Sequence, residues 1–200
     1  MANTIGYNGF RPADTQSASM WNGKLSTYKI KNSYGTNIFK GDPVVLVKTS
    51  NVGYVNSMAA GGSSILGIFW GCQYYDTVQQ KYIFSNMYST GFSPPSGTDI
   101  DCFVIDDPLV EFVAQVSGSA ITNIHVGNNA DVNLGTGSTT TGLSGAYVDY
   151  TTLNTTNTLP FRITGFWPAV VNGVGNDITS ANPLVKVKMN TSQLLSSTGI

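Results

Sequence analysis

The feature of this sequence that most limits its possible folds is the scarcity of helix-forming residues. Glutamate occurs once, at Glu111, and no window longer than about ten residues carries apolar side chains at the spacing of an α-helix. Valine, isoleucine, threonine, tyrosine and phenylalanine are frequent instead, and these residues fit the pleated surface of a β-sheet. We therefore expect an all-β chain.

Short runs of these β-forming residues recur along the chain, separated by clusters of Gly, Asn, Asp and Ser that are typical of turns. The run at 65–76 is long and nearly continuous, which indicates a central strand. One short helix is expected at residues 119–124, with Ser119 as its cap. The pattern predicts a single antiparallel β-sandwich or barrel, with strands at residues 26–31, 43–48, 65–76, 81–84, 102–105, 109–116, 146–150, 159–166 and 184–189.

The first 24 residues differ from the rest, because they contain isolated large side chains without any strand rhythm. Such a segment cannot form a core of its own. We therefore expect an extended N-terminal arm at residues 1–24 that binds a partner, followed by a β-domain at residues 25–200. The arm's aromatic, Arg and Pro residues are of the types that anchor protein interfaces, and the candidate partner contacts are Tyr7, Phe10, Arg11, Pro12 and Trp21. Deletion of this arm is expected to leave the fold intact.

The chain carries very little charge, with 10% charged residues and a net charge of −1. A surface so poor in charge does not repel neighbouring molecules, so we expect it to be covered by partners, including copies of itself. Lys186 and Lys188, two apart in a strand, are expected to share one solvated face. The sequence has no basic stripe for nucleic acid, no apolar run long enough for a membrane helix and no signal-peptide pattern. We therefore expect synthesis in a cytosol.

The residues that could support catalysis do not form a recognisable set. His125, the single histidine, lacks a neighbouring nucleophile or orienting acid in the sequence. The pairs Asp99/Asp101 and Asp106/Asp107 could bind a hard cation, but each lies next to a predicted strand, where Asp commonly caps a turn. We expect no enzyme activity, no metal and no cofactor.

The two cysteines, Cys72 and Cys102, each lie inside an apolar, strand-like run. Their spacing is not that of a CxxC motif, and a cytosol is reducing. Both are expected to be buried free thiols.

A series of short phrases, in order over nearly the whole chain, resembles the head decoration (capsid cement) proteins of tailed bacteriophages. No catalytic motif accompanies the resemblance. The phrases are Gly9-Phe10-Arg11-Pro12, Trp21-Asn22-Gly23, Gly41-Asp42-Pro43-Val44, residues 65–71, Asp106-Asp107-Pro108, Val110-Glu111-Phe112, Val126-Gly127-Asn128, residues 141–145, Pro160-Phe161-Arg162-Ile163 and Val185-Lys186-Val187.

The resemblance implies a small virion structural protein that forms a homotrimer on the outer surface of the capsid, at three-fold or quasi-three-fold positions. Its partner would be the major capsid protein, and it would be synthesised in the cytoplasm of a host bacterium. Binding to the assembled lattice would stabilise the head against the pressure of the DNA inside.

Two other functions remain open from the residues alone. Ten tyrosines and three tryptophans could stack on sugars, which would suit a host-glycan-binding module of a head or tail fibre. The other is a structural component of the tail or neck, which composition does not separate from a head component.

Overall fold

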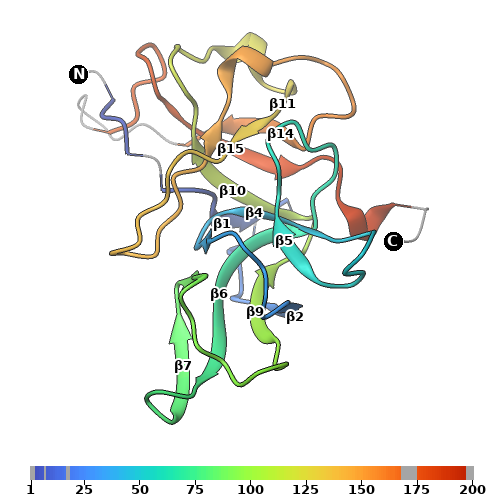
Figure 1. The fold of residues 1–200 in the computed structure, drawn as a ribbon. Coiled ribbons are helices and arrows are strands. Elements are labelled where there is room, and N and C mark those ends of the chain that lie inside the picture. The colour runs from blue at the N-terminus through green and yellow to red at the C-terminus, as the bar shows by residue number, and fades with distance from the viewer. Residues whose placement is uncertain (1–2, 7, 17–18, 168–174, 197–200) are drawn as a thin grey trace.

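The computed structural model describes residues 3–6, 8–16, 19–167 and 175–196 (Figure 1). Three short 3-10 turns occur there, η1 (Asn123–His125), η2 (Tyr150–Thr152) and η3 (Gln193–Leu195), and no α-helix lies within these ranges. No helix in the described part of the chain is long and apolar enough to span a bilayer. The strands are β1 (Arg11–Thr15), β2 (Ser26–Ile30), β3 (Ile38–Phe39), β4 (Pro43–Leu46), β5 (Val55–Ser57), β6 (Gly67–Asp76), β7 (Lys81–Ser85), β8 (Met87–Tyr88), β9 (Ile100–Ile105), β10 (Val110–Gln115), β11 (Asn129–Ala130), β12 (Val132–Asn133), β13 (Tyr147–Val148), β14 (Phe161–Phe166) and β15 (Leu184–Met189).

Two larger sheets dominate the structure. One has five strands in the order β1-β10-β15-β14-β11, and the other has the order β2-β9-β6-β4-β5 with β7 added to β6. Every strand pairing in them is antiparallel, and neither sheet closes into a barrel. The predicted all-β, antiparallel, sandwich-like fold is thus confirmed. In Figure 1, β7 and the part of β6 beside it extend away from the five-stranded sheet.

The larger apolar core lies on the inner face of the five-stranded sheet. It contains Phe112, Phe161 and Val187 from that sheet, and Ile68 and Ile105 from the second sheet, all with no exposed surface. Alternate residues of β15 and of the first half of β14 enter this core while their neighbours stay partly exposed, as expected for a sheet with one buried face. In β10 only Glu111 is partly exposed.

A second core covers the other face of the six-stranded sheet, where Phe69, Tyr88, Cys102 and Val104 pack together. Strand β6 reaches both cores because its successive residues Ile68 and Phe69 point to opposite faces of the sheet. Its register shifts just beyond them, between Phe69 and Gly71. Gly71 has φ +151°, and a Cβ there would lie 3.0 Å from the Ser85 carbonyl oxygen, so this bulge suits glycine. A strand buried on both faces has the continuous apolar sequence that predicted a central position.

Each predicted strand is confirmed, with boundaries shifted by at most two residues, but the helix predicted at residues 119–124 is wrong. Only the 3-10 turn η1 forms nearby, and its cap is Thr122 in place of Ser119. A few residues of moderate helix propensity do not hold a helix unless an apolar face packs, and η1 buries none of its side chains.

The described part of the N-terminal segment is built into the domain. Strand β1 pairs with β10 along one edge of the five-stranded sheet. The Phe10 side chain is fully buried, its ring stacks on Phe161 at a centroid distance of 4.3 Å, and its amide donates to the Gly41 carbonyl at 3.0 Å. Phe10 is therefore a core residue and is corrected from its predicted role as a partner contact.

A buried carboxyl group holds the long loop at 134–145 against the start of β4. Asp42 accepts hydrogen bonds from the Ser144 hydroxyl at 2.5 Å and the Phe39 amide at 2.8 Å. Burial raises the pKa of Asp42 to about 6, although both hydrogen bonds act to lower it. The same loop passes so close to Phe39 that a Cβ at Gly137 would overlap the ring.

We predict that Phe10→Ala lowers the free energy of unfolding by about 3–5 kcal/mol, because it leaves a cavity against Phe161. Urea denaturation measures this difference. Met20→Ala is the control, since Met20 is 86% exposed, and it should change stability by less than about 0.5 kcal/mol. Equal, small effects of the two substitutions would restore the idea of a separable arm. Deletion of residues 1–24 should likewise unfold the domain, which replaces the expectation drawn from the sequence.

We predict that the protein becomes more stable as the pH falls from 7 toward about 4. The folded Asp42 carboxyl has its pKa raised to about 6, above its value in the unfolded chain, so the folded state binds a proton first. The gain is at most about 3 kcal/mol and should disappear in Asp42→Asn, whose amide is never charged. Denaturant titrations at pH 7, 6, 5 and 4.5 test this, and an equal gain in the variant would contradict it.

Candidate interaction surface

Six aromatic side chains gather on the solvent side of the sheet formed by β6, β7 and β9, and on the segment that follows β1. One pair joins the neighbouring strands β6 and β7, a second reaches across β6 from β7 to β9, and a third joins the N-terminal segment to β6. We call this surface the aromatic face, and it consists of Trp21, Trp70, Tyr75, Tyr82, Phe84 and Phe103.

Antiparallel register explains why strand residues of this face meet. Tyr82 of β7 lies opposite Tyr75 of β6, and Phe84 lies opposite Gln73. Successive side chains of a strand point to opposite faces. Tyr74, which lies between Gln73 and Tyr75 in β6, therefore enters the second core. The aromatic residues of β6 are thus divided between the core and the solvent.

The part of the aromatic face on β7 is strongly exposed. Tyr82 and Phe84 are 66% and 71% exposed, although each contacts another ring. Tyr82 meets Tyr75 edge-on at a centroid distance of 5.4 Å, and Phe84 stacks on Phe103 at 6.4 Å. Contiguous exposed apolar surface of this kind marks interaction sites on soluble proteins.

At the other end of the aromatic face, Trp70 is contacted by two side chains. Trp21 packs edge-on against it at a centroid distance of 5.8 Å, and the Lys40 ammonium lies 4.3 Å from the centre of its ring. Trp70, Phe84 and Phe103 line a shallow hollow of about 260 Å³. The indole nitrogen of Trp21 is buried and has no hydrogen-bond partner in the described structure.

Strand β7, which carries Tyr82 and Phe84 of the aromatic face, is an edge strand of its sheet. Residues 81–85 pair with β6, and no backbone hydrogen bond to any other described segment is found for them. An edge strand with free amide and carbonyl groups is a template for pairing with another chain. The Lys29–Asp101 ion pair at 2.5 Å lies in the same row as Gln73 and Phe84, so the charge beside the face is balanced.

The structure brings together only part of the residue set predicted from the sequence. Trp21 is half-buried on the aromatic face, Arg11 is exposed on β1, and Pro12 is half-buried there. Tyr7 lies outside the described residues, and Phe10 belongs to the core. Sequence reasoning did not select the exposed rings of β7 and β9, although period-two alternation sends part of each aromatic run to the solvent.

The titratable residues considered from the sequence have structural partners. Asp106 accepts hydrogen bonds from the Ser26 hydroxyl at 2.9 Å and the Tyr28 hydroxyl at 2.7 Å. Asp99 accepts one from the Tyr54 hydroxyl at 2.7 Å. The exposed His125 accepts one at Nδ1 from a backbone amide at 3.0 Å. Within the described ranges, no group of three His, Cys, Asp or Glu side chains could hold a metal ion.

Both cysteines are buried free thiols, as predicted. They lie directly opposite each other on β6 and β9. Burial raises the pKa of the Cys72 thiol to about 12 and that of Cys102 further, so both stay protonated at neutral pH. A protonated, inaccessible thiol is a poor nucleophile, and these two residues serve packing.

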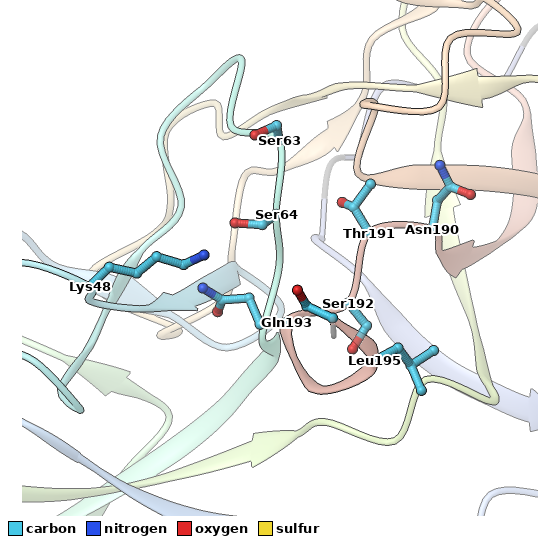
Figure 2. Close-up of a pocket in the computed structure, with 9 residues that line it drawn as sticks. Lys48, Ser63, Ser64, Asn190, Thr191, Ser192, Gln193 and Leu195 are labelled. Atoms are coloured by element: carbon cyan, nitrogen blue, oxygen red, sulfur yellow. The ribbon is translucent and has the colours of Figure 1, made fainter. Parts of the chain in front are cut away.

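A separate, polar hollow of about 330 Å³ lies where the C-terminal turn meets the segments around Lys48 and Ser64 (Figure 2). Hydroxyl and amide groups dominate its lining, including Ser192 and Gln193, and no aromatic ring lines it among the described residues. The Gln193 side chain is already engaged with the backbone of Leu46. The hollow therefore lacks the ring on which a sugar would stack.

Comparison of the chain with protein-family models, with curated proteins and with solved structures found no match. The candidate surface consequently rests on the residues and geometry described above.

We predict that replacing Tyr82 and Phe84 together by Thr reduces self-association and binding of a hydrophobic dye, with a loss of stability below about 1 kcal/mol. Threonine keeps the β-preference of the strand, and an exposed cross-strand pair contributes only a few tenths of a kcal/mol. Sedimentation velocity and dye fluorescence measure the effect. Ile124→Thr, at a site that is 80% exposed on η1, is the control and should change neither signal. Unchanged dye binding in the double variant would remove the aromatic face as a cohesive surface.

Proposed function

We propose that this chain is a structural protein of a virus particle, a decoration (cement) protein that binds the outer surface of a tailed-phage head and stabilises its lattice. The resemblance of its ordered sequence phrases to such proteins supports the proposal. The partners are the major capsid protein and further copies of the chain in a homotrimer. The chain would be made in the cytoplasm of the host bacterium, and its two free thiols suit a reducing compartment.

The observation that carries this proposal is the aromatic face. A fully buried aromatic side chain removes about 150–250 Å² from water, and a standard interface buries about 800 Å² on each partner. Six partly exposed rings therefore supply a large part of one such interface. Tyr and Trp are also the residue types that contribute most to binding energy at interfaces.

The mechanism follows from binding linkage. A protein that binds the assembled lattice, and not the free subunits, stabilises the lattice by about 2.7 kcal/mol per site at a free concentration one hundred times its dissociation constant. A trimer attached through several sites raises the effective affinity further. The low charge of the chain, 10% of residues, keeps repulsion between neighbouring copies small.

A host-glycan-binding module remains the alternative, and the exposed rings of the aromatic face are the feature in its favour. A sugar site combines a stacking ring with convergent hydrogen-bonding groups. Here the two features are apart, since no residue lines both the hollow at Phe84 and the hydroxyl-rich hollow at Ser192. A glycan array with the intact protein separates the two functions, because specific sugar binding is expected only of the alternative.

We predict that the purified chain binds isolated phage heads and that the variant with Thr at Tyr82 and Phe84 does not. Heads from a phage that lacks this gene are incubated with each protein, pelleted, and imaged by electron microscopy. The Ile124→Thr variant should bind like the natural chain, with density at three-fold positions on the outside of the shell. Density on the tail or neck would support the other structural role, and absence of the natural chain from all particles would contradict the proposal.

A further inference from the structure

A row of four charged side chains crosses the outer face of the five-stranded sheet. Asp14 of β1 lies directly opposite Glu111 of β10, Glu111 opposite Lys188 of β15, and Lys188 opposite Arg162 of β14. The signs along the row are two negative charges followed by two positive ones. With Lys186, these residues line one hollow of about 450 Å³, which we call the charged groove.

The acidic end of the charged groove is partly neutralised from within. The Lys186 ammonium lies 2.6 Å from Oδ2 of Asp14 and 3.8 Å from Oε2 of Glu111. These three side chains are only 15–30% exposed, so their attraction is less screened than that of a surface pair. Two carboxylates that face each other across strands repel, and Lys186 offsets part of that repulsion.

The basic end of the charged groove has no such compensation. Among the described residues, neither Lys188 nor Arg162 takes part in an ion pair. Arg162 is held in place because its Nε donates to Oδ1 of Asn129 at 2.8 Å, which leaves the rest of the guanidinium for other contacts. Like charges directly opposite each other in a sheet are unfavourable, and an external anion between them would relieve this.

Two polar atoms with no hydrogen-bond partner complete the site. The Thr164 hydroxyl, which lines the groove beside the basic end, is buried and has no hydrogen-bond partner in the described structure. Oδ1 of Asp14, at the acidic end, is likewise buried and has no hydrogen-bond partner in the described structure. A buried polar atom without a partner is costly, so a ligand with an acceptor at one end and a donor at the other would satisfy both.

We propose that the charged groove binds an acidic peptide segment, whose carboxylate lies between Lys188 and Arg162 while a backbone amide donates to Asp14. The guanidinium fork and the ammonium are suited to a carboxylate. Among the described residues that line the groove, none is aromatic. This favours a peptide over an acidic sugar, because sugar faces stack on rings. The identity of the partner as a shell subunit rests on the proposed function, whereas the binding chemistry does not.

The experiment is an NMR titration of the intact, ¹⁵N-labelled chain with a blocked tri-glutamate peptide, compared with a blocked tri-glutamine peptide and N-acetylneuraminic acid. We expect the glutamate peptide alone to shift the amides of Glu111, Arg162, Thr164 and Lys188, and added salt to weaken its binding. Loss of one charge-assisted contact in Lys188→Gln should raise the dissociation constant by about tenfold.

Lys24→Gln is the matched control, because Lys24 is an exposed lysine outside the groove. It should bind the peptide like the natural chain. Lys188→Gln is suited to the test because Lys188 has no ion pair or side-chain hydrogen bond in the described structure, so its loss should leave the melting temperature unchanged. Absence of shifts, equal weakening in both variants, or binding of the sugar acid alone would overturn the proposal. If the peptide binds the groove but the chain does not attach to phage heads, the proposed function is contradicted and the proposal for the groove stands.

Discussion

The structure depends on one strand, β6, that supplies side chains to two cores at once. Its successive residues Ile68 and Phe69 point to opposite faces, Ile68 toward the five-stranded sheet and Phe69 toward the opposite layer. The bulge at Gly71 then turns the strand, and its far half carries the β6–β7 hairpin away from the first core (Figure 1). The aromatic face exists because this half of β6 is buried on one side only.

The fold class and most strands could be predicted because period-two alternation is a local property of the sequence. The strands that were missed, such as β1 and the short β3 and β8, form through partners distant in the chain. Phe10 illustrates the difficulty, since an isolated aromatic residue in a polar segment gives no sign that Phe161 will stack on it. The helix expected after Ser119 failed because tertiary packing decides whether a short segment holds a helix.

The candidate surfaces were predictable only in part, for a related reason. The shared face of Lys186 and Lys188 follows from their spacing, and the structure places both in one groove. Their acidic neighbours come from β1 and β10, and strand order cannot be read from a single sequence. The rings of Tyr82 and Phe84 could have been assigned to the solvent only with the register of β6 and β7 in hand.

The two surfaces differ in the kind of information that each can give a partner. Apolar contacts at the aromatic face are non-directional and grow with the area removed from water, so they supply affinity but tolerate several orientations. The ordered signs of the charged groove, with Asp14 and Glu111 at one end and Lys188 and Arg162 at the other, fix the direction of an opposing charge pattern. In a chain with so few charged residues, we infer that a row of four on one sheet sets the orientation of a partner, while the rings supply cohesion.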